Sequence, residues 1–152
     1  MRRKGTLYLI VGAYGSGKDT LISTVSQILG NIYVPVKHTT RKIRHNEVQG
    51  REYHFVEQLN SEMFVQYHVY GANYGVEKEI SVQLEKGFDV MLNISNRLVD
   101  EIRKKYTQTK VIYVFAATKH LKNRIKHRGR DNEGEISERL ARAKQNIPFS
   151  DN

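Results

Sequence analysis

The stretch Gly12-Ala13-Tyr14-Gly15-Ser16-Gly17-Lys18-Asp19-Thr20 follows directly after the apolar run Thr6 to Val11. Closely spaced glycines let the backbone curl so that successive N–H groups face inward, and the start of a following helix adds partial positive charge. The spacing G-x-x-x-x-G-K is far more specific than a single glycine-rich turn. The stretch therefore predicts a phosphate-binding loop between a strand and a helix, with Lys18 reaching the outer phosphates.

The residue after Lys18 is Asp19, where such a loop normally carries a Ser or Thr hydroxyl that helps to hold magnesium. A carboxylate is a hard oxygen ligand and can coordinate Mg²⁺ directly or through water, although it brings negative charge near bound phosphates. Thr20 is an alternative source of the hydroxyl. Asp19 can equally serve only to favour the positive end of the helix dipole. Metal binding by Asp19 and Thr20 is therefore one of two interpretations.

The composition narrows the class of protein and of partner. The length of 152 residues fits one domain with a core of its own, and the net charge of +9 indicates an anionic partner. No nucleic-acid-binding module is recognisable, which favours small phosphorylated ligands over nucleic acid. The absence of cysteine excludes disulfides and thiolate sites and is consistent with a cytoplasmic protein. No stretch is long enough to span a membrane, and nothing in the pattern bears on oligomeric state.

Strand-like and helix-like patterns alternate along the chain. Apolar runs of strand length lie at 6–11, 32–37, 53–56, 88–92 and 111–115, and helical patterns at 21–29, 59–67, 77–86, 98–106, 119–128 and 136–143. Residues 71–75 carry turn chemistry. This alternation predicts an α/β fold, with a parallel sheet covered by helices on both faces.

The same patterns predict one domain over 1–152 with three parts. The core spans 5–38 and 77–118, an acceptor-binding insert spans 39–76, and a lid spans 119–146. The chain stops soon after residue 147. We therefore expect this domain to lack a C-terminal strand and helix beyond the last predicted helix.

Two groups of arginines stand out. The segment 39–53 contains Arg41, Arg44 and Tyr53, and a guanidinium can grip two phosphate oxygens while a tyrosine hydroxyl completes the shell without adding charge. Arg124 and Arg128 lie one helical turn apart on the later helix, where a bound phosphate would turn their mutual repulsion into attraction. The alternative for both groups is an ordinary solvated basic surface.

These motifs together resemble the guanylate kinase family over nearly the whole chain. The resemblance implies a P-loop nucleoside monophosphate kinase-like fold of three layers and transfer of the ATP γ-phosphoryl group, with Mg²⁺, onto an acceptor phosphate. It implies donor-side residues Gly12, Gly15, Ser16, Gly17, Lys18, Asp19, Thr20, Arg124 and Arg128. It implies acceptor-side residues Arg41, Arg44, Tyr53, Gln66, Tyr74, Ser95 and Arg139. Lys18, Arg128 and Arg139 would serve catalysis.

The positions that read guanine in that family do not match. A serine, a glutamate and an aspartate are expected there, whereas this chain has Lys37, Gln66 (or Val65, depending on one gap) and Ser95. A charge-assisted hydrogen bond to a carboxylate is worth about 1.5 to 3 kcal/mol, so its loss weakens guanine recognition.

A sister branch, ribose 1,5-bisphosphate phosphokinase, is similar in other places, including the Gly17-Lys18-Asp19 loop ending and the ungapped stretch from Tyr67 to Val76. The sequence therefore favours ribose 1,5-bisphosphate narrowly as acceptor, with GMP as the alternative. A second alternative is a protein-binding module without catalysis, against which the intact phosphate loop argues.

Overall fold

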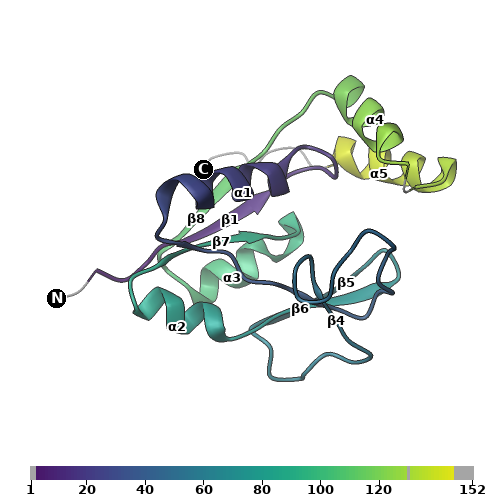
Figure 1. Cartoon of the computed structure of the whole chain (residues 1–152). Coiled ribbons are helices and arrows are strands. Elements are labelled where there is room, and N and C mark those ends of the chain that lie inside the picture. Colours follow the sequence, from purple (N-terminus) through teal and green to yellow (C-terminus); the bar gives the residue numbers. More distant parts are fainter. Residues whose placement is uncertain (1–2, 130, 146–152) are drawn as a thin grey trace.

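The computed structural model describes residues 3–129 and 131–145, and within them the chain forms a parallel sheet, a smaller mixed sheet and surrounding helices (Figure 1). Arg130 and the final segment 146–152 lie outside the described residues. The parallel sheet consists of β1 (Leu7–Val11), β2 (Ile32–Tyr33), β7 (Asp89–Asn93) and β8 (Thr109–Tyr113). The helices are α1 (Lys18–Leu29), α2 (Glu79–Glu85), η1 (Asn96–Leu98), α3 (Val99–Lys105), α4 (Thr118–His127) and α5 (Glu133–Gln145).

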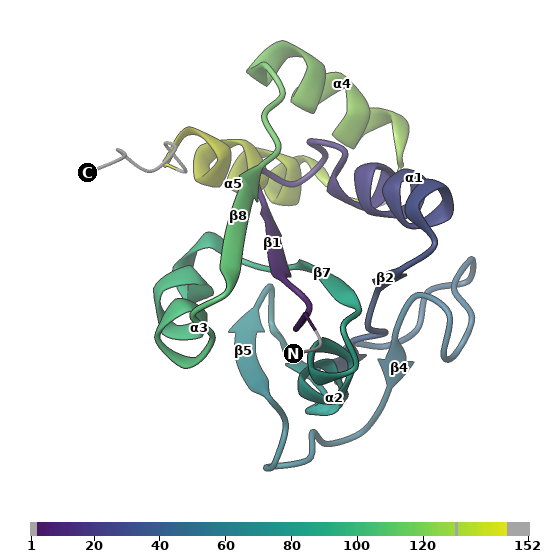
Figure 2. The ribbon, with the colours of Figure 1, turned by 90° about the vertical axis from the view of Figure 1, so that its left-hand side faces the viewer.

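The parallel sheet has the strand order β2-β7-β1-β8, and every pairing in it is parallel. Helix α1 covers one face, whereas α2 and α3 cover the other, as the two perpendicular views show (Figures 1 and 2). The predicted α/β fold with helices on both faces of a parallel sheet is confirmed. Because parallel strands end at the same edge, the loop after β1 and the last residue of β7 lie next to each other, which is where such sheets bind ligands.

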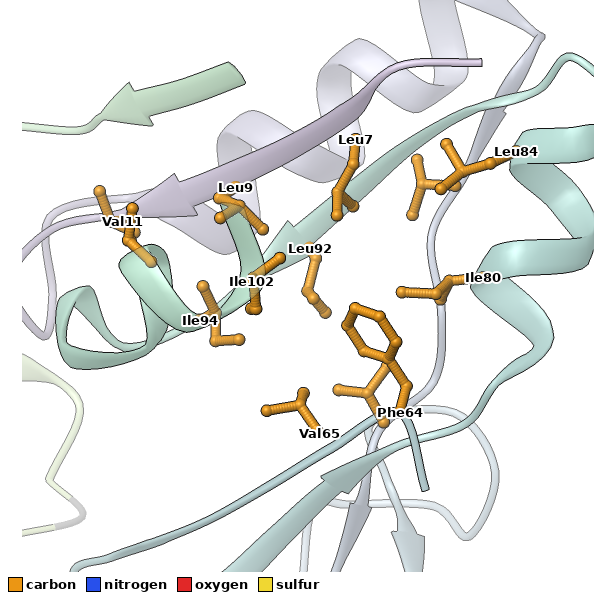
Figure 3. Packing of buried hydrophobic residues seen from close by; sticks show 13 residues of the cluster. Leu7, Leu9, Val11, Phe64, Val65, Ile80, Leu84, Leu92, Ile94 and Ile102 are labelled. Atoms are coloured by element: carbon orange, nitrogen blue, oxygen red, sulfur yellow. The ribbon is translucent and has the colours of Figure 1, made fainter. Parts of the chain in front are cut away.

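The main core lies between the sheet and the α2–α3 layer (Figure 3). Leu7, Leu9 and Val11 alternate along β1 onto this face, whereas Ile10 points to the α1 face and packs with Ile22. Phe64, from outside the parallel sheet, joins the main core. Burial of each such side chain stabilises the fold by about 1.5 to 3 kcal/mol. The shared core therefore fixes the small sheet against the large one.

The small sheet contains β3 (His38–Thr39), β4 (His54–Phe55), β5 (Val65–Val69) and β6 (Ala72–Val76), in the order β4-β3-β6-β5. The predicted helix at 59–67 is wrong, because β5 is an extended strand whose side chains alternate between buried and exposed positions. The predicted turn at 71–75 is also wrong, because most of that segment belongs to strand β6. The turn itself is a two-residue hairpin turn at Tyr70 and Gly71, with φ of 51° and 72°.

Two further helices follow β8 and lie beyond the carboxyl edge of the parallel sheet (Figure 1). Helices α4 and α5 pack on each other, and Leu121 and Ile125 are the buried positions of α4. Gly129 has a φ of 57° just past the end of α4, as the sequence predicts for a helix terminus. Of the helices described, none combines the length and the apolar character that a membrane span requires.

Candidate active site

The loop between β1 and α1 has the backbone that its glycines predict. Gly12, Gly15 and Gly17 all have positive φ, at 140°, 82° and 103°. Gly12 is also sterically required, because a Cβ there would lie 2.3 Å from the carbonyl oxygen of Val114. Ser16 is buried, and its Oγ has no partner among the described residues. A buried hydroxyl without a partner, within a loop of this shape, fits a bound phosphate.

Lys18 begins α1 and folds back over the loop. Its Nζ donates to the carbonyl oxygens of Gly12 and Ala13 at 2.8 and 2.7 Å. Burial lowers the pKa of Lys18 to about 8, and although Asp19 raises it, the charges of Lys37 and Arg128 lower it further. An anion bound in the loop would supply the counter-charge that this ammonium lacks.

Asp19 is exposed and accepts a 2.6 Å hydrogen bond at Oδ1 from the side-chain amide of Asn93, at the end of β7. Thr20 is exposed on the next position of α1. The described residues contain no group of three or more His, Cys, Asp or Glu side chains that would hold a metal ion by itself. One carboxylate with an adjacent hydroxyl fits Mg²⁺, which proteins commonly bind through one or two carboxylates together with substrate phosphates.

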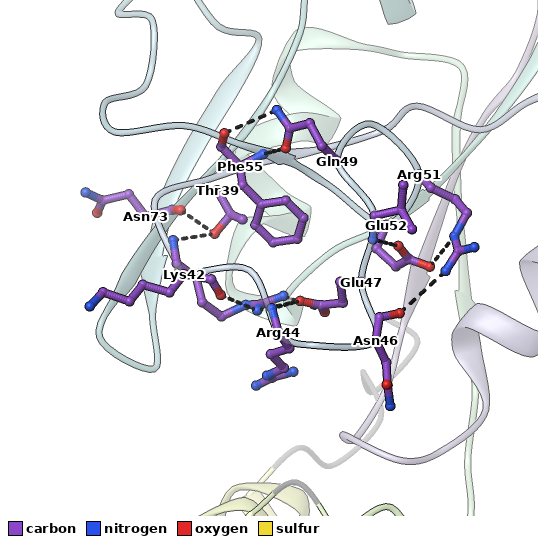
Figure 4. A network of polar contacts seen from close by, with 12 residues as sticks. Thr39, Lys42, Arg44, Asn46, Glu47, Gln49, Arg51, Glu52, Phe55 and Asn73 are labelled. Atoms are coloured by element: carbon purple, nitrogen blue, oxygen red, sulfur yellow. Dashed lines mark hydrogen bonds and ion pairs between the residues drawn. The ribbon is translucent and has the colours of Figure 1, made fainter.

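An ion pair between Arg41 and Glu47 shapes the acceptor segment. Figure 4 shows the polar contacts around Glu47. Both terminal guanidinium nitrogens of Arg41 donate to the carboxylate, at 2.8 and 2.9 Å, and the backbone N–H of Arg44 donates to the same carboxylate at 2.9 Å. The hydrogen bonds from Arg41 hold the pKa of Glu47 below its usual value, although burial opposes the shift. Thr39 is fully buried and donates to the carbonyl oxygen of Asn73, which ties the segment to β6.

Three tyrosines line the same side of the small sheet. The ring of Tyr53 lies 5.4 Å from the Arg41 guanidinium carbon and 5.8 Å from the ring of Tyr74, measured between centroids. Tyr67 stacks on Tyr74 at 5.4 Å. The structure thus brings together Arg41, Tyr53 and Tyr74, three of the residues that the sequence groups on the acceptor side.

Gln66 and Ser95 are not part of the cluster of Arg41, Tyr53 and Tyr74. The side-chain amide of Gln66 donates to the carbonyl oxygen of Asn60 at 2.6 Å, on the exposed face of β5. Ser95 is the residue before η1 and is only partly buried; its hydroxyl makes no capping hydrogen bond. Neither side chain is a carboxylate, so neither offers the charged acceptor that guanine's N–H groups prefer.

The two helices after β8 bring arginines to the phosphate loop. Arg124 donates to the carbonyl oxygens of Gly15 and Ser16, both at 3.3 Å. The guanidinium carbon of Arg128 lies 5.6 Å from the ring centroid of Tyr14, within the same loop. Both arginines therefore lie against the loop, as the sequence predicts, and Arg124 is already engaged with its backbone.

Arg139 is held by an ion pair and by two tyrosine rings, which its position in the sequence does not indicate. It is buried, pairs with Asp131 at 2.7 Å, and its guanidinium carbon lies 3.8 Å from the ring centroid of Tyr14. On its other side it lies 4.5 Å from the ring of Tyr70, at the tip of the β5–β6 hairpin. Arg139 thus connects the phosphate loop, α5 and the small sheet.

Sequence reasoning missed several residues that organise this site. Asp131 and Tyr70 gave no signal, because their partners are distant in the chain. Asn93 is a polar residue that ends a buried strand at the carboxyl edge of a parallel sheet, and that position was a usable signal.

A glycine-rich loop between a parallel strand and a helix, with basic groups facing it from two directions, defines the class of P-loop phosphotransferases. The family model described as guanylate kinase matches residues 4–150. The chain belongs to the guanylate kinase family, and with it to the ATP-dependent kinases that phosphorylate a phosphate group.

The relatives are similar over nearly the whole chain. A guanylate kinase of Saccharophagus degradans is 33% identical over 97% of this chain and 76% of that protein. A guanylate kinase of Escherichia coli is 35% identical over 92% of this chain and 73% of that protein. The crystal structure of guanylate kinase from Anaplasma phagocytophilum superposes with a TM-score of 0.67 over 95% of this chain and 85% of that one, at 22% identity, and supports the fold alone.

Proposed function

We propose that this chain transfers the γ-phosphoryl group of ATP to the phosphate of GMP, forming ADP and GDP. The relatives support GMP, because those at 33% and 35% identity are named guanylate kinase. One observation of the site carries the proposal. Asn93 bonds Asp19 of the donor loop through its side chain and accepts from Lys37, beside Tyr53, through its backbone. A single residue, Asn93, therefore joins the donor loop to the acceptor segment, and transfer between two phosphates requires that they be held close together.

Positioning and charge supply the catalysis in this proposal. An oxygen of the acceptor phosphate attacks the γ-phosphorus, a new P–O bond forms, and the bond to the β-phosphate oxygen breaks with its electrons leaving on ADP. The attacking oxygen is already anionic, so no general base is needed. Lys18 holds the outer phosphates, and Arg128 and Arg139 offset the charge on the transferred group. Asp19 and Thr20 would hold Mg²⁺, which would offset negative charge on the phosphates.

Ribose 1,5-bisphosphate is the second candidate acceptor. The specific observation in its favour is the lack of a carboxylate at Gln66 and Ser95, and of a serine at Lys37, where the resemblance expects guanine to be read. The named relatives favour GMP instead. GMP is therefore the preferred acceptor here, although the sequence narrowly favours ribose 1,5-bisphosphate.

Coupled ADP release distinguishes the candidates when GMP, AMP, CMP, UMP and ribose 1,5-bisphosphate are assayed in parallel. We expect kcat/KM to be highest with GMP. Turnover with ribose 1,5-bisphosphate and none with GMP would replace the acceptor, and turnover with none of them would favour a binding module. Lys18→Ala should lower kcat by about 1,000-fold or more with the fold intact, since it removes the cation at the outer phosphates.

A further inference from the structure

Lys37 lies between the donor loop and the acceptor segment, on the connection that leads from β2 into β3. Its Nζ donates to the backbone carbonyl of Asn93 at 3.1 Å and lies 5.5 Å from the ring centroid of Tyr53. The side chain of the same Asn93 holds Asp19 at 2.6 Å. Lys37 therefore lies beside both phosphate-binding segments.

The charge of Lys37 is available to a ligand, whereas the charge of Arg41 is paired with a carboxylate. Both terminal guanidinium nitrogens of Arg41 donate to Glu47, and one of them also donates to the carbonyl oxygen of Lys42. No ion pair joins Lys37 to a carboxylate within the described part of the chain, and Asp19 is the carboxylate whose charge acts on it. The ammonium of a lysine has three donors, of which the Asn93 carbonyl and the Tyr67 hydroxyl take two.

The chemistry that completes such a site is an anion with several oxygens. A partly buried ammonium without a paired carboxylate is stabilised by a bound negative charge. Lys37 also acts on the donor side. Burial is the main cause of the lowered pKa of Lys18, and the charge of Lys37 lowers it further.

We propose that Lys37, which stands where the resemblance expects a serine that reads guanine, instead contacts the acceptor phosphate and sets the preference of the site for a charged acceptor. It stays protonated throughout, so it moves no proton; it holds the attacking phosphate oxygen near the γ-phosphorus while the bond to ADP breaks. This inference rests on the proposed function for the reaction, but it does not depend on which acceptor is used.

The experiment compares Lys37→Met, Lys37→Arg and the wild-type chain with Lys42→Met as matched control. Lys42 is an exposed lysine of the same segment, so its variant loses the same charge. Kinetics with GMP and with ribose 1,5-bisphosphate give KM and kcat for acceptor and for ATP. We expect Lys37→Met to lower kcat/KM for the acceptor by about 30-fold or more, with KM for ATP within about twofold. Lys37→Arg should retain most of the activity, and Lys42→Met all of it.

Equilibrium binding of both acceptors without ATP, measured by calorimetry, tests Lys37 even where no turnover occurs. Acceptor affinity in Lys37→Met equal to that of the wild type would overturn the role of Lys37 while leaving the proposed function standing. A parallel loss for ATP and acceptor together with a lowered Tm would also overturn it, because that pattern indicates a structural role. A wild-type chain that binds an acceptor without turnover contradicts only the proposed function, and one that binds neither acceptor contradicts both.

Discussion

At the scale of single residues, the lowered pKa of Lys18 is the property with the clearest consequence. The ammonium is buried against carbonyl oxygens alone, and two nearby cations oppose its charge. The free enzyme therefore holds it at a pKa of about 8, whereas bound phosphate favours the charged form.

This property predicts a pH dependence of ATP affinity. Below about pH 8 Lys18 is charged in the free enzyme, so the affinity is flat there. Above that pH the free enzyme loses the proton and must regain it on binding, so the affinity falls by up to about tenfold per pH unit. Fluorescence titration of an ATP analogue between pH 6.5 and 9.5 measures this.

Lys37→Met is the internal control for that titration. Removing one of the cations that lower the pKa of Lys18 should move the midpoint upward. A midpoint that stays in place, or a flat profile to pH 9.5 in the wild-type chain, contradicts the electrostatic account of the loop.

Single residues also show where sequence prediction succeeds and where it fails. Lys18, Arg41 and Tyr53 could be predicted because each belongs to a motif of fixed spacing along the chain. The partners of Arg139, namely Asp131, Tyr14 and Tyr70, could not be predicted. They come from three different connections between elements, and only tertiary packing brings them together.

At the scale of elements, Glu47 organises the loop that precedes β4. Its carboxylate accepts from two side-chain nitrogens of Arg41 and from the backbone of Arg44, and it is nearly buried. Replacing it leaves a mostly buried guanidinium without its counter-charge, which costs about 2 to 3 kcal/mol.

We therefore expect Glu47→Gln to lower the free energy of unfolding by about 2 kcal/mol and to reduce acceptor kcat/KM more than KM for ATP changes. Urea denaturation and steady-state kinetics measure the two effects. Glu57→Gln is the matched control, because Glu57 is exposed and lies on the connection that follows β4. Equal stability of the two variants would show that the Arg41–Glu47 pair does not shape the loop.

The β5–β6 hairpin and α5 meet through Tyr70, whose ring lies 4.5 and 4.6 Å from the guanidinium carbons of Arg139 and Arg142. These residues also line a cavity of about 460 Å³ between hairpin and helix. The sequence pattern predicts a helix and a turn here instead of a hairpin, because the alternation in Val65–Val69 is too short to be distinguished from a helical period.

Tyr70→Asn should loosen α5 without breaking the turn, since Asn tolerates the positive φ of this position. We expect faster amide hydrogen exchange in α5, by about threefold to tenfold, because two cation–π contacts are lost. Tyr70→Phe keeps the ring and should exchange like the wild-type chain. Unchanged exchange in Tyr70→Asn means that the hairpin does not hold α5.

At the scale of the whole molecule, two basic regions face the carboxyl edge of one parallel sheet, and the shared core holds them in place. Phe64 and Val65 pack into the same cluster as Leu9 and Leu92, so the acceptor segment is fixed relative to the phosphate loop (Figure 3). The alternation of strands and helices predicted this layered fold correctly, because its signal is local and repeated along the chain.

The most direct test of the central claim follows the γ-phosphate itself. The chain is incubated with GMP and ATP labelled with ³²P at the γ-position, and the products are separated by thin-layer chromatography. We expect the label to move to the β-phosphate of GDP, and Lys18→Ala to abolish this transfer. Label that stays in ATP, or appears only as inorganic phosphate, would contradict phosphoryl transfer to GMP.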